Sequence, residues 1–133
     1  MKRILLAYDG TEHAKRALEM AADFAGRYEA PISVVSVIPV HGGRAPIDPW
    51  DDPATHRGQL QEARQLLLQS GIEAELLEPA GDPAEAIERV AEAGGFDTIV
   101  IGSRGLGAVG RFLQGSVSEH VATHARATVV IAR

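Results

Sequence analysis

The chain contains no cysteine, so disulfide bonds, thiol catalysis and cysteine-ligated metal sites are excluded. It also lacks any apolar run close to the roughly 18–20 residues that a membrane-spanning helix needs. Basic residues are in the minority, because 13 lysines and arginines stand against 18 aspartates and glutamates, and the net charge is -5. Such a balance argues against a nucleic-acid or anionic-membrane binder. We therefore expect no nucleic-acid and no membrane partner, and any anion site must be locally positive.

The chain has 133 residues and a hydrophobic content of 45%, which is enough for one domain over residues 1–133. The basic and apolar start, "MKRILLAY", is too short for a secretory signal and reaches Asp9 at once. We interpret it as a strand and expect a cytoplasmic protein.

Short apolar segments rich in β-branched residues predict strands that are mostly buried on both faces of a parallel sheet. The predicted strands are Arg3–Tyr8, Ile32–Ile38, Glu73–Glu78, Asp97–Ile101 and Thr128–Ala132. The third is more polar than the others, as an edge strand can be.

Helical spacing of apolar residues lies between these strands. The predicted helices are Thr11–Gly26, Pro53–Ser70, the segment "DPAEAIERVAEA" from Asp82, and a helix from Ser116 to about Ala125. Thr11, Asp82 and Ser116 are expected N-caps, and the last two carry a glutamate three residues later, as in a capping box.

Alternation of strands and helices predicts an α/β fold: a three-layer, doubly wound, five-stranded parallel sheet with Rossmann-like strand order 3-2-1-4-5. The chain changes direction between the first and fourth strands, and ligands of such folds bind beyond the carboxyl ends there. The first strand ends at Asp9 and the fourth at Gly102, so a glycine-rich segment falls at the predicted crevice.

That segment, "GSRGLGAVGRFLQGS", can be interpreted in three ways. A G-x-G-x-x-G pattern at Gly105–Gly110 follows the wrong strand and has no carboxylate about 20 residues later. A P-loop-like pattern at Gly110–Ser116 lacks the lysine that phosphates require. The third pattern is G-x2-G-x9-G-[ST], formed by Gly102, Gly105, Gly115 and Ser116. It would bring backbone N–H groups and a helix N-terminus to a phosphate, with Arg104 and Arg111 adding charge.

The third pattern resembles the nucleotide-binding signature of the universal stress protein family, in its ATP-binding branch. The resemblance covers nearly the whole chain. "RILLAYDGTEHAKRALEMAADFA" is similar to that family's first strand, turn and helix, and "FDTIVIGSRGLGAVGRFLQGSVSEHVATHARATVVIAR" to its C-terminal half. It implies that the chain binds ATP together with Mg²⁺ and acts in stress adaptation.

The resemblance also implies which residues hold the nucleotide. These are Ala7, Asp9, Val37, Ile101, Gly102, Arg104, Gly105, Gly115, Ser116 and Val117, with Asp9 as the residue that could hold nucleotide-bound Mg²⁺. Structural roles stay open for some of them. The alternative role of Asp9 is an Asx turn alone, and that of Ser116 is a helix N-cap alone. The alternative for Arg104 and Arg111 is that both are solvated loop side chains.

The function implied is a nucleotide-dependent switch that acts on an unknown protein partner, with at most slow ATP hydrolysis. One alternative is a nucleotide-free interaction module of the same fold. Another is an ATP-using enzyme of the adenylylation or ligase type, which would need a second pocket with acid or base groups that the sequence does not reveal.

Three further features carry expectations. His120 and His124 have metal-binding spacing, but the sequence specifies no third ligand, so we expect a solvated or half-buried helix face. The segment Pro39–Pro53 is either a lid or a surface insertion. The strand at residues 128–132 lies at a predicted sheet edge without proline, and we expect a homodimer through it, as the family resemblance also implies.

Overall fold

The computed structural model describes residues 1–39, 53–103 and 114–133. Its main sheet has five parallel strands in the order β4-β2-β1-β6-β7. Their bounds are β1 Ile4–Ala7, β2 Ile32–Val35, β4 Glu75–Leu77, β6 Thr98–Gly102 and β7 Thr128–Ala132. Counted along the chain, this order is the predicted 3-2-1-4-5, so the fold prediction is confirmed.

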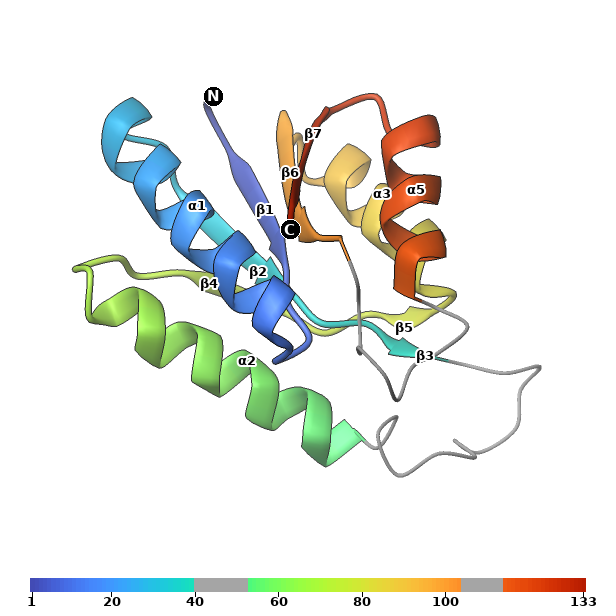
Figure 1. The fold of residues 1–133 in the computed structure, drawn as a ribbon, viewed down its shortest axis with the longest axis horizontal. Helices are drawn as coiled ribbons and strands as arrows, with labels where there is room; N and C mark the ends of the chain where they lie inside the picture. The colour runs from blue at the N-terminus through green and yellow to red at the C-terminus, as the bar shows by residue number, and fades with distance from the viewer. Residues whose placement is uncertain (40–52, 104–113) are drawn as a thin grey trace.

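Helices cover both faces of the sheet, which makes the three predicted layers (Figure 1). Helices α1 (Glu12–Tyr28) and α2 (Pro53–Leu68) pack on one face, and α3 (Pro83–Ala93) and α5 (Gln114–His124) on the other. Among the described residues, no helix is both long and apolar enough to cross a membrane.

The core consists of two clusters separated by the sheet. Strand β1 is fully buried and alternates between them, with Ile4 and Leu6 in the cluster under α1 and α2, and Leu5 and Ala7 in the cluster under α3 and α5. Because side chains of a strand point alternately to opposite faces, a central strand covered on both sides must be continuously apolar. The segment "ILLA" meets that requirement.

Local capping signals place two helix starts as predicted. The Thr11 hydroxyl accepts a hydrogen bond from Ala14 N at 3.2 Å, and the Asp82 carboxylate accepts one from Glu85 N at 3.1 Å. The predicted N-cap at Ser116 is wrong, because α5 already begins at Gln114. The N–H groups of a first helical turn have no partner within the helix. The sequence therefore fixes the first residue of a helix only to within one or two positions.

The predicted strand Ile32–Ile38 is interrupted. Strand β2 ends at Val35, and a short β3 (Ile38–Pro39) pairs with an unpredicted β5 (Ala80–Gly81). Hydrogen bonds from Ser36 N to Leu77 O at 3.1 Å and from Ile38 N to Pro79 O at 2.9 Å connect the two ladders. Pro79 lacks an N–H group and cannot donate to the ladder, which accounts for the break beside it.

Candidate functional site

The carboxyl ends of β1 and β6 lie side by side at the point where the winding of the sheet reverses. Ala7, the last residue of β1, is paired in register with Val35 on one side and Ile101 on the other. Asp9 lies two residues after Ala7, and Gly102 lies directly after Ile101. The topology therefore brings the two ends of the predicted site together at the location where doubly wound folds bind ligands.

Asp9 forms the Asx turn that leads into α1. Its Oδ1 accepts hydrogen bonds from Thr11 N at 3.1 Å and from Thr11 Oγ1 at 2.7 Å, and Gly10 between them has a φ of 81°. The Thr11 hydroxyl thus donates to Asp9 while it accepts from Ala14 N. Asp9 therefore fixes the start of α1 through Thr11, whatever else its carboxylate does.

Gly102 has a packing reason that the sequence pattern did not reveal. A β-carbon at this position would lie 2.8 Å from the carbonyl carbon of His13 and 3.0 Å from Ala14 N. Real β-carbons do not approach backbone this closely, so only glycine lets the end of β6 reach the first turn of α1.

Ser103, the residue after Gly102, connects several elements. Its N–H donates to Ala132 O at 2.6 Å, its Oγ lies 3.1 Å from His13 Nδ1, and its carbonyl accepts from the buried Ser118 Oγ at 3.2 Å. The ends of β6 and β7, the start of α1 and the helix α5 are joined through this one residue. Sequence patterns missed His13 and Ser118, and the only available signal was the position of Ser103 inside the glycine motif.

An apolar border adjoins this polar network on the α3 and α5 face. Ala7, Val37 and Ile101 are buried in one cluster, and Val117 packs against it. Four predicted site residues therefore belong to one apolar cluster although they come from four separate parts of the chain.

The remaining predicted residues belong to the glycine-rich segment. The backbone of Gly115 and Ser116 lies in the first turn of α5, where helix N–H groups have no intrahelical partner. Arg104, Gly105 and Arg111 lie outside the described residues, as do residues 40–52, which are most of the segment Pro39–Pro53 that we interpret as a lid or a surface insertion.

Polar pairs on the opposite face of the sheet, under α2, are buried or partly buried. The Ser36 hydroxyl lies 2.8 Å from His56 Nδ1, and both residues are only 3% exposed. The Tyr8 hydroxyl donates to Glu62, and burial, followed by the neighbouring Glu62 carboxylate, raises the pKa of Tyr8 far above its usual range. These pairs attach α2 to the ends of β1 and β2.

Comparison with known proteins gives a consistent result. The family model described as "Universal stress protein family" matches residues 1–133. A Thermus aquaticus protein named as a universal stress protein in the QAH/OAS sulfhydrylase 3' region is 36% identical over 135 residues, which cover 99% of this chain and 98% of that protein. The structure of an Archaeoglobus fulgidus universal stress protein is 27% identical, with a TM-score of 0.82, and covers 100% of this chain and 99% of that one.

A second Archaeoglobus fulgidus structure is described as the universal stress protein in complex with dAMP. It is 27% identical, has a TM-score of 0.81, and the match covers 100% of this chain and 98% of that one. The fold, the full-length family match and the sequence identity agree: the chain belongs to the universal stress protein family.

Proposed function

We propose that the chain binds ATP, together with Mg²⁺, at the carboxyl ends of β1 and β6. The observation that supports this proposal is the pairing of Ala7 with Ile101 at the winding reversal, which brings Asp9, Gly102 and the apolar border to one edge of the sheet. Ser118 of α5 donates to the carbonyl of Ser103 at the same edge. A family relative of the same fold is described in complex with dAMP, which supports an adenine nucleotide as the ligand class.

The two sides of the site suit different parts of a nucleotide. The apolar border of Ala7, Val37, Ile101 and Val117 is suited to the adenine base. The backbone N–H groups of Gly115 and Ser116 are suited to phosphate, and Arg104 and Gly105 would complete that end.

Asp9 is suited to Mg²⁺ by its chemistry, because this ion prefers carboxylate oxygens and is usually held by one or two of them together with substrate phosphates. Its Oδ1 already accepts two hydrogen bonds from Thr11, so the ion would have to share a carboxylate that is held in place by the turn. A carboxylate fixed in this way loses little conformational freedom when the ion binds.

The function we infer is a switch in the stress response of the cytoplasm. A nucleotide that contacts β1, β6 and α5 at once would favour one arrangement of these elements. ATP would bind the two arrangements with different affinities. This difference sets how far the affinity for a protein partner can change when ATP binds. Turnover is not needed for this function, and any ATP hydrolysis would be slow.

We further propose that the chain is a homodimer through β7. This strand lies at the end of the sheet, and Ile131 on it is 39% exposed although it is a large apolar residue. A second copy of the same strand can pair with it antiparallel about a two-fold axis.

Isothermal titration calorimetry of the full chain with ATP and Mg²⁺ tests the nucleotide proposal, with GTP as the control for the base. We expect saturable ATP binding at one site per chain and weaker GTP binding. A folded protein that binds no adenine nucleotide would instead support an interaction module, and ATP turnover within seconds would support an enzyme.

A further inference from the structure

A cluster of potential metal ligands is shared between α3 and α5, with Glu88 half-buried and both histidines exposed. His120 and His124 are one turn apart on α5, with ring centroids separated by 4.1 Å and ring planes inclined by 20°. Glu88 reaches them from α3, and one ligand atom from each of the three residues lies within 4.8 Å of the other two. The third ligand that the sequence did not specify therefore comes from a residue 32 positions away.

Both imidazole rings are held by hydrogen bonds. Nδ1 of His120 lies 2.8 Å from Glu88 Oε2, and Nδ1 of His124 lies 2.9 Å from the carbonyl oxygen of His120. The second bond requires that Nδ1 of His124 carries the proton, because a carbonyl oxygen only accepts. In the neutral ring the other nitrogen, Nε2, then keeps its lone pair, which is the state in which histidine binds a metal.

We propose that Glu88, His120 and His124 form a binding site for a divalent transition-metal ion of the Zn²⁺ class. The ion takes the place of the proton shared by His120 Nδ1 and Glu88 Oε2, and His124 Nε2 supplies the third ligand. Ligand atoms around tetrahedral Zn²⁺ are about 3.3–3.6 Å apart, given bond lengths near 2.0–2.2 Å. The separation of His120 Nδ1 and Glu88 Oε2, observed at 2.8 Å, has to widen by roughly half an ångström or more to admit the ion.

The chemistry of the three ligands selects the class of ion. Two imidazoles and one carboxylate suit Zn²⁺ and its neighbours in the first transition row, whereas Ca²⁺ and Mg²⁺ prefer oxygen ligands alone. Three protein ligands also leave a coordination position for water or an exogenous ligand.

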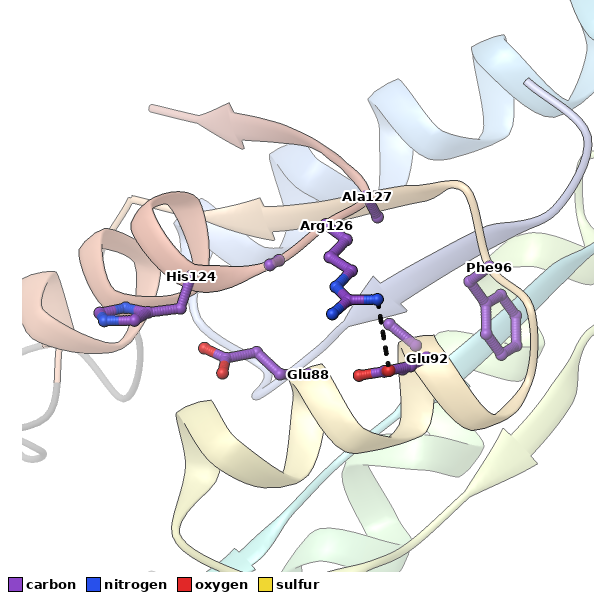
Figure 2. A pocket seen from close by; sticks show the side chains of 8 residues that line it. Glu88, Glu92, Phe96, His124, Arg126 and Ala127 are labelled. Carbon is purple, nitrogen blue, oxygen red and sulfur yellow. Dashed lines mark ion pairs between the residues drawn. The ribbon is translucent and has the colours of Figure 1, made fainter.

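The surroundings give the ion access and space. The side chains of His120 and Glu88 are 42% and 21% exposed, so an ion can arrive from solvent without opening the core. Beside them is a cavity of about 130 Å³ that Glu88 and His124 help to line (Figure 2). The Arg126–Glu92 ion pair, 3.9 Å long and highly exposed, lies at the same cavity, so the guanidinium charge there is partly balanced.

An ion at this site would link α3 to α5. The carboxylate comes from α3 and both imidazoles come from the C-terminal part of α5, whose first turn contains Gly115 and Ser116. Because the ligands are brought together only in the folded chain, binding stabilises the native state. The site is separate from the proposed nucleotide site and does not depend on it.

Metal-stripped full-length protein titrated with ZnCl₂ in a non-chelating buffer tests the proposal. We expect one ion per chain by calorimetry, and a rise in melting temperature of about 5 °C or more when Zn²⁺ is well above its dissociation constant. Titration with Co²⁺ should give visible absorption bands typical of low-coordinate nitrogen and oxygen ligation.

The variants assign the site. Glu88→Gln, His120→Gln and His124→Gln should each weaken Zn²⁺ binding at least tenfold. Glu92→Gln is the matched control, because it removes the same charge from the same helix at the same cavity but from outside the ligand set. His124→Gln keeps the test valid if Glu88→Gln unfolds, since His124 is exposed. Absent Zn²⁺ binding by the wild type, unchanged binding by the three variants, or an equal loss in Glu92→Gln would overturn the proposal.

Discussion

The α-carbon of Gly102 lies so close to the first turn of α1 that a β-carbon there would sit 2.8 Å from the carbonyl carbon of His13. This contact sets the distance between the end of β6, where the proposed site lies, and the start of α1. The same His13 is connected to Ser103 by a 3.1 Å side-chain contact. The neighbours Gly102 and Ser103 thus both contact His13: Gly102 determines the spacing of the crevice and Ser103 its polar network.

Gly102→Ala should therefore destabilise the fold, because the added carbon overlaps backbone that cannot move aside cheaply. We expect a loss of about 1–3 kcal/mol in the free energy of unfolding, measured by urea denaturation. Gly26→Ala in α1 is the control, since a β-carbon there meets nothing within 4 Å. That variant should be stabilised by about 0.5–1 kcal/mol. Equal stability of the two variants would contradict the packing role of Gly102.

Asp9→Ala should weaken ATP binding more than it weakens folding. The turn made with Thr11 predicts a modest fall in melting temperature, and the lost carboxylate predicts a larger fall in affinity in the presence of Mg²⁺. Thr11→Val separates the two roles, because it removes the hydroxyl bond to Asp9 and the cap of α1 while it keeps the carboxylate and the backbone N–H bond of the turn. If calorimetry gives the same loss of affinity for both variants, Asp9 acts only through the Thr11 hydroxyl and the helix cap.

Gly115→Val should abolish ATP binding while the fold survives. The proposed role of Gly115 requires bare backbone next to phosphate, which a branched side chain would block. Calorimetry measures the affinity, and circular dichroism checks the fold. Gly26→Val gives the cost of the same substitution in a helix away from the site. Unchanged ATP affinity of Gly115→Val would exclude the third interpretation of the glycine motif.

The sequence was sufficient for the features that depend on local chemistry. Strand order followed from the alternation of buried strands and helices, and the caps at Thr11 and Asp82 followed from side-chain type alone. Contacts between distant segments could not be predicted. Ser103 and His13 are 90 residues apart, and His120 and Glu88 are 32 apart. No periodicity in a single sequence records which side chains the crossovers bring together.

The protein should lose stability in acid when the Asp97 carboxylate becomes protonated. Burial alone would raise its pKa, but hydrogen bonds from the backbone N–H groups of Lys2 and Arg3 and from the Thr98 hydroxyl together lower the pKa below its ordinary value of 3.8. A carboxylate with a lowered folded pKa contributes stability that is complete above the unfolded value and is lost as the pH falls through the folded value.

Asp97→Ala should therefore lose about 1 kcal/mol of stability at pH 7, since the carboxylate is partly exposed and its bonds are screened. Below the folded pKa of Asp97 the wild type and the variant should become equally stable. Urea denaturation between pH 2 and pH 7 measures both curves. Asp23→Ala removes an exposed carboxylate that pairs only within α1, and it should change stability by less than about 0.5 kcal/mol. A constant difference between wild type and Asp97→Ala over the whole range would contradict this prediction.

The proposed dimer can be tested at one specific residue of β7. Thr128 N donates to Asp97 O, and Ala132 O accepts from Ser103 N, so the backbone polar groups of these two residues point toward β6. Because such groups alternate along a strand, Val130 also bonds toward β6, whereas Val129 and Ile131 present theirs to the open edge.

Proline at 130 would break the sheet itself. Ile131→Pro removes a donor only from the open edge and should leave the fold intact. Light scattering coupled to size exclusion should show a wild type of twice 14.1 kDa and an Ile131→Pro monomer. A wild-type mass of 14.1 kDa at micromolar concentration would exclude the dimer, and a dimer that persists in Ile131→Pro would place the interface elsewhere.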